Sequence, residues 1–202
     1  HNNPCGAAAA PKLVEALAAA WAGDPLSAFG SVLGFTREVD LASADFLVSE
    51  NRFVEAILAP SFAPDALERL KTGAKWGKNV RLLACGPLGT AQKGRAPLEV
   101  KPLRGGFLVQ ERDLALGGLE RCETMTTAAP TQEQLASLLF ANKVGKHVKS
   151  NAIVLASGTR VLGVGAGQMS RVDSVRLALA KAGAAAQGSV LASDAFFPFR
   201  DG

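Results

Sequence analysis

Tyrosine is absent from this sequence of 202 residues, which has only two tryptophans, two methionines and three cysteines. Aromatic side chains make up 6% of the chain, which argues against stacking platforms for nucleic-acid bases. The net charge of +4 is mild, so it favours anionic small molecules without indicating a nucleic-acid surface. We therefore expect small anionic ligands and no nucleic acid as partners.

The three cysteines, Cys5, Cys85 and Cys122, are far apart in the sequence. They fit neither a disulfide framework nor a C-x-x-C metal site, and such usage is typical of a cytoplasmic protein. No apolar run is long enough to cross a bilayer, so we expect no membrane association. The sequence opens on His1 without a methionine or a signal peptide, so we interpret it as part of a longer protein.

Predicted strands and helices alternate along the chain, and a hydrophobic content of 48% suffices for a sizeable core. This alternation predicts a three-layer α/β fold of two similar units, residues 1–103 and 104–202. Residues 86–102, rich in glycine, proline and lysine, are interpreted as a connection. The patterns predict strands at residues 31–35, 53–58, 80–84, 105–110, 152–155, 161–164 and 190–192, and helices at 10–21, 42–50, 64–71, 131–144 and 172–182.

Residues 149–172 combine two predicted strands, a glycine-rich loop and the start of a helix. Gly165 and Gly167 allow the backbone to turn sharply and to approach a ligand closely. The unpaired N–H groups of a helix start suit a phosphate or carboxylate, and Arg171 adds a guanidinium that binds such anions bidentately. The same pattern also fits a tight strand-to-helix turn with a solvated arginine, so the motif alone leaves both interpretations open.

Six segments spread over the chain carry a resemblance to a known family. They are HNNPCG from His1, WAGDPLSAFGS from Trp21, FVEAILAP from Phe53, KHVKSNAIVLA from Lys146, GVGAGQMSRVDS from Gly163 and SDAFFPF from Ser193. Together they resemble the transformylase domain of the AICAR transformylase/IMP cyclohydrolase family. The resemblance implies two tandem cytidine-deaminase-like units with mixed sheets, without the deaminase zinc and without a cyclohydrolase domain.

The family reaction moves a formyl group from 10-formyltetrahydrofolate to the 5-amino group of AICAR, an aminoimidazole carboxamide ribotide. The product is FAICAR, an intermediate of purine biosynthesis. The resemblance thus implies AICAR and folate as partners, no catalytic metal, and a homodimer with active sites across its interface. In the family a lysine directly precedes the histidine of HNNPCG, and this position lies outside the sequence. We therefore expect residues 1–202 alone to be inactive.

The resemblance implies a catalytic role for two residues. His1 would accept or relay the proton of the AICAR amine, because histidine titrates near neutral pH. Asn151 would contact AICAR and polarise the reacting centre, since its amide can donate and accept together. Outside this family context, His1 would be an ordinary chain end and Asn151 a turn residue at a strand end.

Further positions match substrate contacts of the family. Arg171 resembles an arginine at the nucleotide site, and Val172 a neighbouring folate contact. The backbone of Gly30 would meet AICAR, where a side chain would block the approach. Glu55 stands where the family has an acidic substrate contact, although on its own it fits an exposed strand carboxylate equally well.

The terminal segment also matches folate contacts. Phe196 would pack on the pterin or benzoyl ring, and Asp201 would accept hydrogen bonds from pterin N–H groups. Taken alone, the aromatic run is more typical of core packing. Three other functions remain open: a nucleotide-binding module without catalysis, a structural protein, and a deaminase-like enzyme. The last would need zinc ligands of the type H-x-E with P-C-x-x-C, which the sequence lacks.

Overall fold

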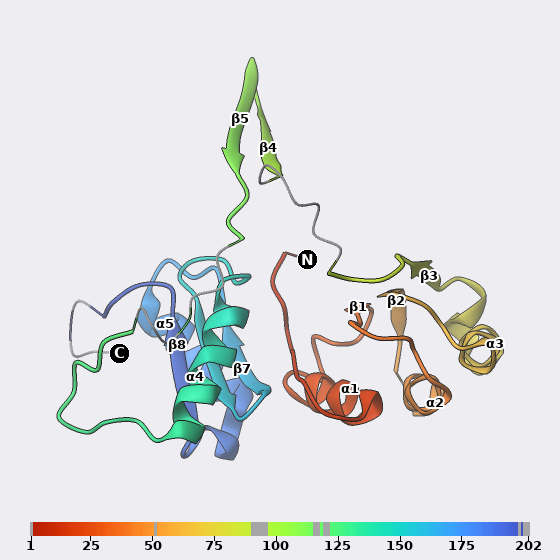
Figure 1. The fold of residues 1–202 in the computed structure, drawn as a ribbon, viewed down its shortest axis with the longest axis horizontal. Helices are drawn as coiled ribbons and strands as arrows, with labels where there is room; N and C mark the ends of the chain where they lie inside the picture. Colours follow the sequence, from red (N-terminus) through yellow and green to blue (C-terminus); the bar gives the residue numbers. More distant parts are fainter. Residues whose placement is uncertain are drawn as a thin grey trace.

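The computed structural model describes residues 2–50, 52–89, 97–114, 118, 122–197 and 199, which form two α/β lobes and a projecting hairpin (Figure 1). The first lobe contains α1 (Leu13–Ala22), β1 (Ser31–Gly34), α2 (Leu41–Val48), β2 (Val54–Ala59), α3 (Pro64–Thr72), the 3-10 helix η1 (Lys75–Lys78) and β3 (Arg81–Ala84). The hairpin consists of β4 (Leu98–Leu103) and β5 (Gly106–Glu111). The second lobe contains α4 (Gln132–Gly145), β6 (Ile153–Ser157), β7 (Arg160–Gly165), α5 (Arg171–Ala182), the 3-10 helix η3 (Gly183–Ala186) and β8 (Val190–Ser193).

The first lobe is built on a parallel sheet in the order β1-β2-β3. Helices α1, α2 and α3 lie on the same side of this sheet (Figure 1) and bury an apolar core that includes Leu47, Ile57 and Leu70. Outside this core Val32 of β1 and Leu83 of β3 are 64% and 47% exposed. In the described part of the chain this sheet therefore has helices on one face only.

The second lobe contains an antiparallel sheet in the order β7-β6-β8. Successive side chains of β6 point to opposite faces, as in any strand. Val154 packs in one cluster with Ala141 of α4, whereas Ile153 and Leu155 pack in another with Ala178 of α5. This lobe therefore has three layers, with its sheet between α4 and α5.

Both parallel and antiparallel sheets are present, which agrees with the predicted α/β class. Within the described ranges, however, neither lobe has a mixed sheet of the kind expected. The strands of the first lobe are joined by helical crossovers, which make neighbours parallel, whereas a tight turn joins β6 to β7 and makes them antiparallel. The similarity of each lobe to a cytidine deaminase stays a prediction.

Helix α5 lies unusually close to β7 because β7 carries two glycines. A Cβ atom on Gly163 would meet the backbone oxygen of Ala178, and one on Gly165 would meet that of Ser174. From the sequence, Gly165 was predicted to lie in a sharp turn that approaches a ligand. In the structure its missing side chain instead makes room for the helix, and the positive φ of 68° is found at Gly167.

The N-terminal residues before α1 pair with a strand of the second lobe, and the chain then continues into the first lobe. Ala8 bridges Arg160 of β7, with hydrogen bonds from Ala9 N to Thr159 O (2.8 Å) and from Val161 N to Ala7 O (2.9 Å). The N-terminal segment therefore extends the second sheet along β7 and then continues into α1. As a result, the two lobes are tied together at the start of the chain.

Strand β4 of the hairpin occupies residues that were interpreted as a connection, whereas β5 corresponds to the strand predicted at residues 105–110. Strand β4 pairs with β5 from Leu98↔Glu111 to Leu103↔Gly106, and the side chains of both strands are exposed. The predicted boundary between residues 103 and 104 falls at the turn of this hairpin. The division into units 1–103 and 104–202 stays a prediction.

The other predicted helices and strands are present, with ends that differ by up to three residues. A 3-10 helix, η1, is present at residues 75–78, where neither a helix nor a strand was predicted. None of the helices in the described ranges is both long enough and apolar enough to span a bilayer.

Replacing Gly165 by alanine should destabilise the protein by about 1–3 kcal/mol, because the new methyl group forces α5 away from β7. Gly34→Ala is the matched control, since a Cβ at that strand position has no atom within 4 Å. Chemical denaturation of both variants measures the difference. Equal unfolding free energies would contradict the packing role of Gly165.

Candidate functional site

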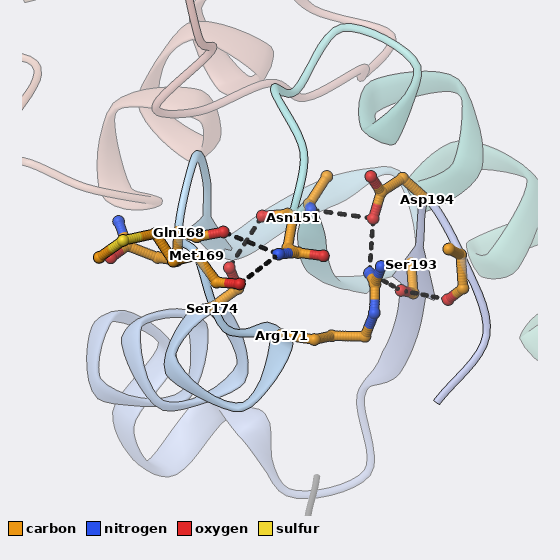
Figure 2. Close-up of polar contacts among 9 residues, drawn as sticks. Asn151, Gln168, Met169, Arg171, Ser174, Ser193 and Asp194 are labelled. Carbon is orange, nitrogen blue, oxygen red and sulfur yellow. Dashed lines mark hydrogen bonds and ion pairs between the residues drawn. The ribbon is translucent and has the colours of Figure 1, made fainter. Parts of the chain in front are cut away.

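Asn151 is held in place by the glycine loop and by α5. Its side-chain Nδ2 donates to the backbone oxygens of Gln168 (2.8 Å) and Met169 (3.2 Å), as Figure 2 shows. The Ser174 hydroxyl donates to the backbone oxygen of Asn151 at 2.8 Å. The peptide bond between Ser150 and Asn151 is cis. Because loop carbonyls engage the amide nitrogen, the group that Asn151 can offer to a ligand is its Oδ1 acceptor.

Arg171 is the first residue of α5, and its guanidinium does not extend into solvent. Nη1 donates to Ser193 Oγ at 2.7 Å and to Asp194 Oδ1 at 2.5 Å (Figure 2). The side chain is 13% exposed, and its guanidinium carbon lies 5.9 Å from the ring centre of Phe197. The solvated arginine of the alternative interpretation is therefore wrong. These contacts use Nη1, and a guanidinium has further N–H donors on the rest of its fork.

Asp194 connects Arg171 to the segment around Asn151. Its Oδ1 also accepts a hydrogen bond from the backbone N–H of Ala152 at 3.0 Å. Burial alone would raise the pKa of Asp194. The hydrogen bonds from Ser150, Arg171 and Ala152, together with the charge of Arg171, outweigh burial and lower this pKa to about 2. Asp194 is therefore ionised throughout the neutral pH range.

Asn3, in the N-terminal segment HNNPCG, contacts Lys149, which lies in the segment KHVKSNAIVLA. The side-chain Oδ1 of Asn3 accepts a hydrogen bond from the backbone N–H of Lys149 at 2.7 Å. Residue 3 thus contacts a position two residues before Asn151, although 146 positions separate them in sequence. His1 itself lies outside the described residues, so its expected role stays a prediction.

A cavity of about 860 Å³ lies between the lobes and is large enough for a small-molecule ligand. Cys5, Gly30, Gln168 and Lys181 are among the residues that line it. Gly30 has a φ of 76°, and its N–H donates to Phe53 O at 2.8 Å, so the turn requires this glycine. The cavity therefore brings together Gly30 and the loop that holds Asn151.

An ion pair between the lobes borders this cavity. Lys181 Nζ lies 2.9 Å from Asp24 Oδ2, and the Asp24 side chain is 7% exposed. Burial would raise the pKa of Asp24, but hydrogen bonds from the Ser27 N–H and from Lys181 lower it overall. Burial, with the nearby charge of Asp24, raises the pKa of the Cys5 thiol, so this thiol ionises less readily than an exposed cysteine.

Of the described residues with a predicted role in binding or catalysis, Gly30 lines this cavity, whereas Asn151, Arg171, Glu55, Val172 and Phe196 do not. Glu55 of β2 accepts a hydrogen bond from Arg81 at 2.8 Å, in an exposed ion pair. Phe196 is 80% exposed, and Val172 is half-buried in the first turn of α5. Asp201 lies outside the described residues. The substrate roles of Glu55, Val172, Phe196 and Asp201 stay predictions.

The described ranges contain no group of three or more His, Cys, Asp or Glu side chains placed to hold a metal ion. The expectation that catalysis needs no metal is not tested by this observation and stays a prediction.

Comparison with protein families gives a match over residues 1–181 to the family described as AICARFT/IMPCHase bienzyme. The chain belongs to this family. Three curated relatives named "Bifunctional purine biosynthesis protein PurH" match all of the chain. They come from Rhodopirellula baltica (47% identical), Sorangium cellulosum (50%) and Myxococcus xanthus (48%). The chain spans 37–38% of the length of these relatives.

The sequence of this AICARFT/IMPCHase chain alone did not predict a role for Asn3, Gln168 or Asp194. All three lie within segments that carried the resemblance. Their contacts join segments distant along the chain, Asn3 with Lys149 and Asp194 with Arg171. Local residue patterns contain no information about such pairings.

Asn3→Ala should loosen the connection between the N-terminal motif and Lys149. A hydrogen bond of this kind contributes about 0.5–1.5 kcal/mol, so the Lys149 amide should exchange with solvent roughly two- to tenfold faster. Hydrogen exchange read by mass spectrometry measures this change, with the exposed neighbour variant Asn2→Ala as the control. Unchanged exchange at Lys149 in Asn3→Ala would refute the connection.

The low pKa of Asp194 predicts a specific acid response. The pKa falls from 3.8 in an unfolded chain to about 2 in the folded protein, so ionised Asp194 stabilises the fold above pH 3.8. That contribution is lost as the pH falls towards 2. In Asp194→Asn, the unfolding free energy should therefore depend less steeply on pH between 3.8 and 2. Denaturation at a series of pH values measures this slope, and a slope equal to that of the wild type would contradict the assignment.

Proposed function

We propose that this chain supplies substrate-binding and catalytic residues to a formyltransferase that transfers a formyl group from 10-formyltetrahydrofolate to AICAR in purine biosynthesis. Membership of the AICARFT/IMPCHase bienzyme family supports this proposal. The structural observation that most supports the proposal, in addition to family membership, is the contact between Asn3 and Lys149. Through this contact, residue 3 lies beside the segment that leads into Asn151.

The proposed reaction makes three demands on the protein. The AICAR amine is a weak nucleophile because its lone pair is delocalised over the ring and carboxamide. Transfer therefore needs a proton acceptor, stabilisation of the tetrahedral oxyanion and alignment of the two substrates. In the proposal His1 accepts or relays the proton, and the Oδ1 of Asn151 accepts a hydrogen bond from the aminoimidazole carboxamide.

The binding of AICAR is assigned to groups around the cavity and α5. Gly30 allows the ligand to approach the backbone. Arg171 binds an anionic group of AICAR through the guanidinium N–H groups that do not face Asp194. Val172, Phe196 and Asp201 would contact the folate, and Glu55 a polar group of a substrate. The proposal includes a cytoplasmic homodimer whose partner subunit completes the site.

Arg171→Ala should raise the KM for AICAR tenfold to over a hundredfold, since a lost charge-assisted hydrogen bond costs about 1.5–3 kcal/mol. The measurement is steady-state formyl transfer in an enzyme completed to the full length of its relatives. Arg176→Ala is the matched control, because Arg176 is on the same helix and its side chain is 75% exposed.

Cyclisation of FAICAR to IMP provides a second control in the same enzyme. Arg171→Ala should leave this activity unchanged if the chain serves formyl transfer. An unaltered KM for AICAR would refute the role of Arg171. Loss of cyclisation with intact formyl transfer would assign the chain to the other half of the bienzyme.

A further inference from the structure

We propose that Asp194 is a positioning residue that holds Asn151 and Arg171 in one fixed arrangement for formyl transfer. This inference rests on the proposed function and gives a role to a residue that the substrate contacts do not include. It is carried by the geometry of a single carboxylate that contacts both elements of the site (Figure 2).

Asp194 fixes the backbone on both sides of Asn151. Its Oδ1 accepts from the N–H of Ala152, which follows Asn151, and its carboxylate also accepts from the side chain of Ser150, which precedes it. Asp194 N in turn donates to Ala152 O at 3.3 Å. The residue between these two anchored neighbours therefore has little freedom to rotate.

The same oxygen fixes Arg171. Nη1 lies 2.5 Å from Oδ1, and Ser193 Oγ accepts from Nη1 at 2.7 Å while it donates to Ala195 O at 2.7 Å. The Arg171 side chain is 13% exposed and that of Asp194 is 25% exposed, so the pair is shielded from most of the solvent. A charge-assisted contact in such surroundings restricts an arginine more than an exposed ion pair does.

Three elements that are distant in sequence therefore meet at Asp194. They are the start of β6, the first turn of α5 and the end of β8. Asn151 is further connected to α5 through Ser174. Movement of α5 relative to the sheet would thus displace both Asn151 and Arg171, and the carboxylate of Asp194 opposes that movement.

Asp194 also partly neutralises the charge of Arg171, and this effect opposes the positioning role. A neutralised arginine attracts an anion less strongly, so removal of the Asp194 charge could by itself tighten AICAR binding. The two roles consequently predict opposite changes in KM. We expect orientation to dominate, because small displacements of substrate-aligning groups cost up to about a hundredfold in rate.

The test is Asp194→Asn in the enzyme completed to the length of its relatives. It should raise the KM for AICAR roughly tenfold, through the released Arg171, and lower kcat roughly tenfold, through the loosened Asn151. Asp194→Glu retains the charge and should recover part of the KM effect. Asp173→Asn, an exposed carboxyl variant on α5, should stay within about twofold of the wild type.

A double-mutant cycle separates positioning from an independent role. Combined with Arg171→Ala, Asp194→Asn should raise the KM no further, whereas its effect on kcat should remain. A lower KM for AICAR in Asp194→Asn would overturn the proposal in favour of simple charge neutralisation. Kinetics within twofold of the wild type, or KM effects that multiply in the double variant, would overturn it as well.

The unfolding free energies of the same variants distinguish this inference from the proposed function. Non-additive unfolding free energies in an enzyme that lacks formyl transfer would support the contact between Asp194 and Arg171. They would overturn the proposed function, and with it the catalytic role of Asp194. Active enzyme with additive unfolding free energies would overturn the positioning role alone.

Discussion

The close packing of α5 on β7 is the constraint on which the site depends. Because Gly163 and Gly165 have no side chains, the helix backbone lies directly on the strand. That position places Ser174 against the backbone of Asn151 and Arg171 against Asp194. A larger residue in β7 would therefore alter more than the local packing, since both polar groups of the site are attached to this helix.

The site is stabilised by contacts among its own members as well as by the core beneath it. Between the sheet and α5, Ile153, Leu155 and Ala178 form an apolar layer. In the site itself, the polar groups pair with one another. The amide of Asn151 donates to a loop carbonyl, and Arg171 donates to Ser193 and Asp194. Partly buried polar groups that are paired in this way favour one arrangement, because breaking any pair leaves its partner without that contact.

Sequence patterns predicted the helices and most strands because these depend on local periodicity. Helix α4 shows why: Thr131 and Gln134 form a capping box that can be identified from the residues alone. Strand β4 was not predicted, since proline and glycine near residues 86–102 indicate loops and only the pairing with β5 makes a strand there. The candidate positions Gly30 and Asn151 came from family resemblance, and Arg171 came from both the glycine-rich motif and the resemblance. The hydrogen-bond partners of Asn151 and Arg171 required the three-dimensional structure.

The pairing of the N-terminal segment with β7 has a consequence for synthesis in the cell. Thr159 Oγ1 donates to Ala9 O across 150 positions of the chain. During translation, residues 7–9 therefore have no strand partner until β7 has left the ribosome. The first lobe can form its own core earlier, but residues 7–9 can pair only after the second lobe has been synthesised. Closing so long a loop makes this docking a late step in folding, and the segment that contains Asn3 reaches its place only then.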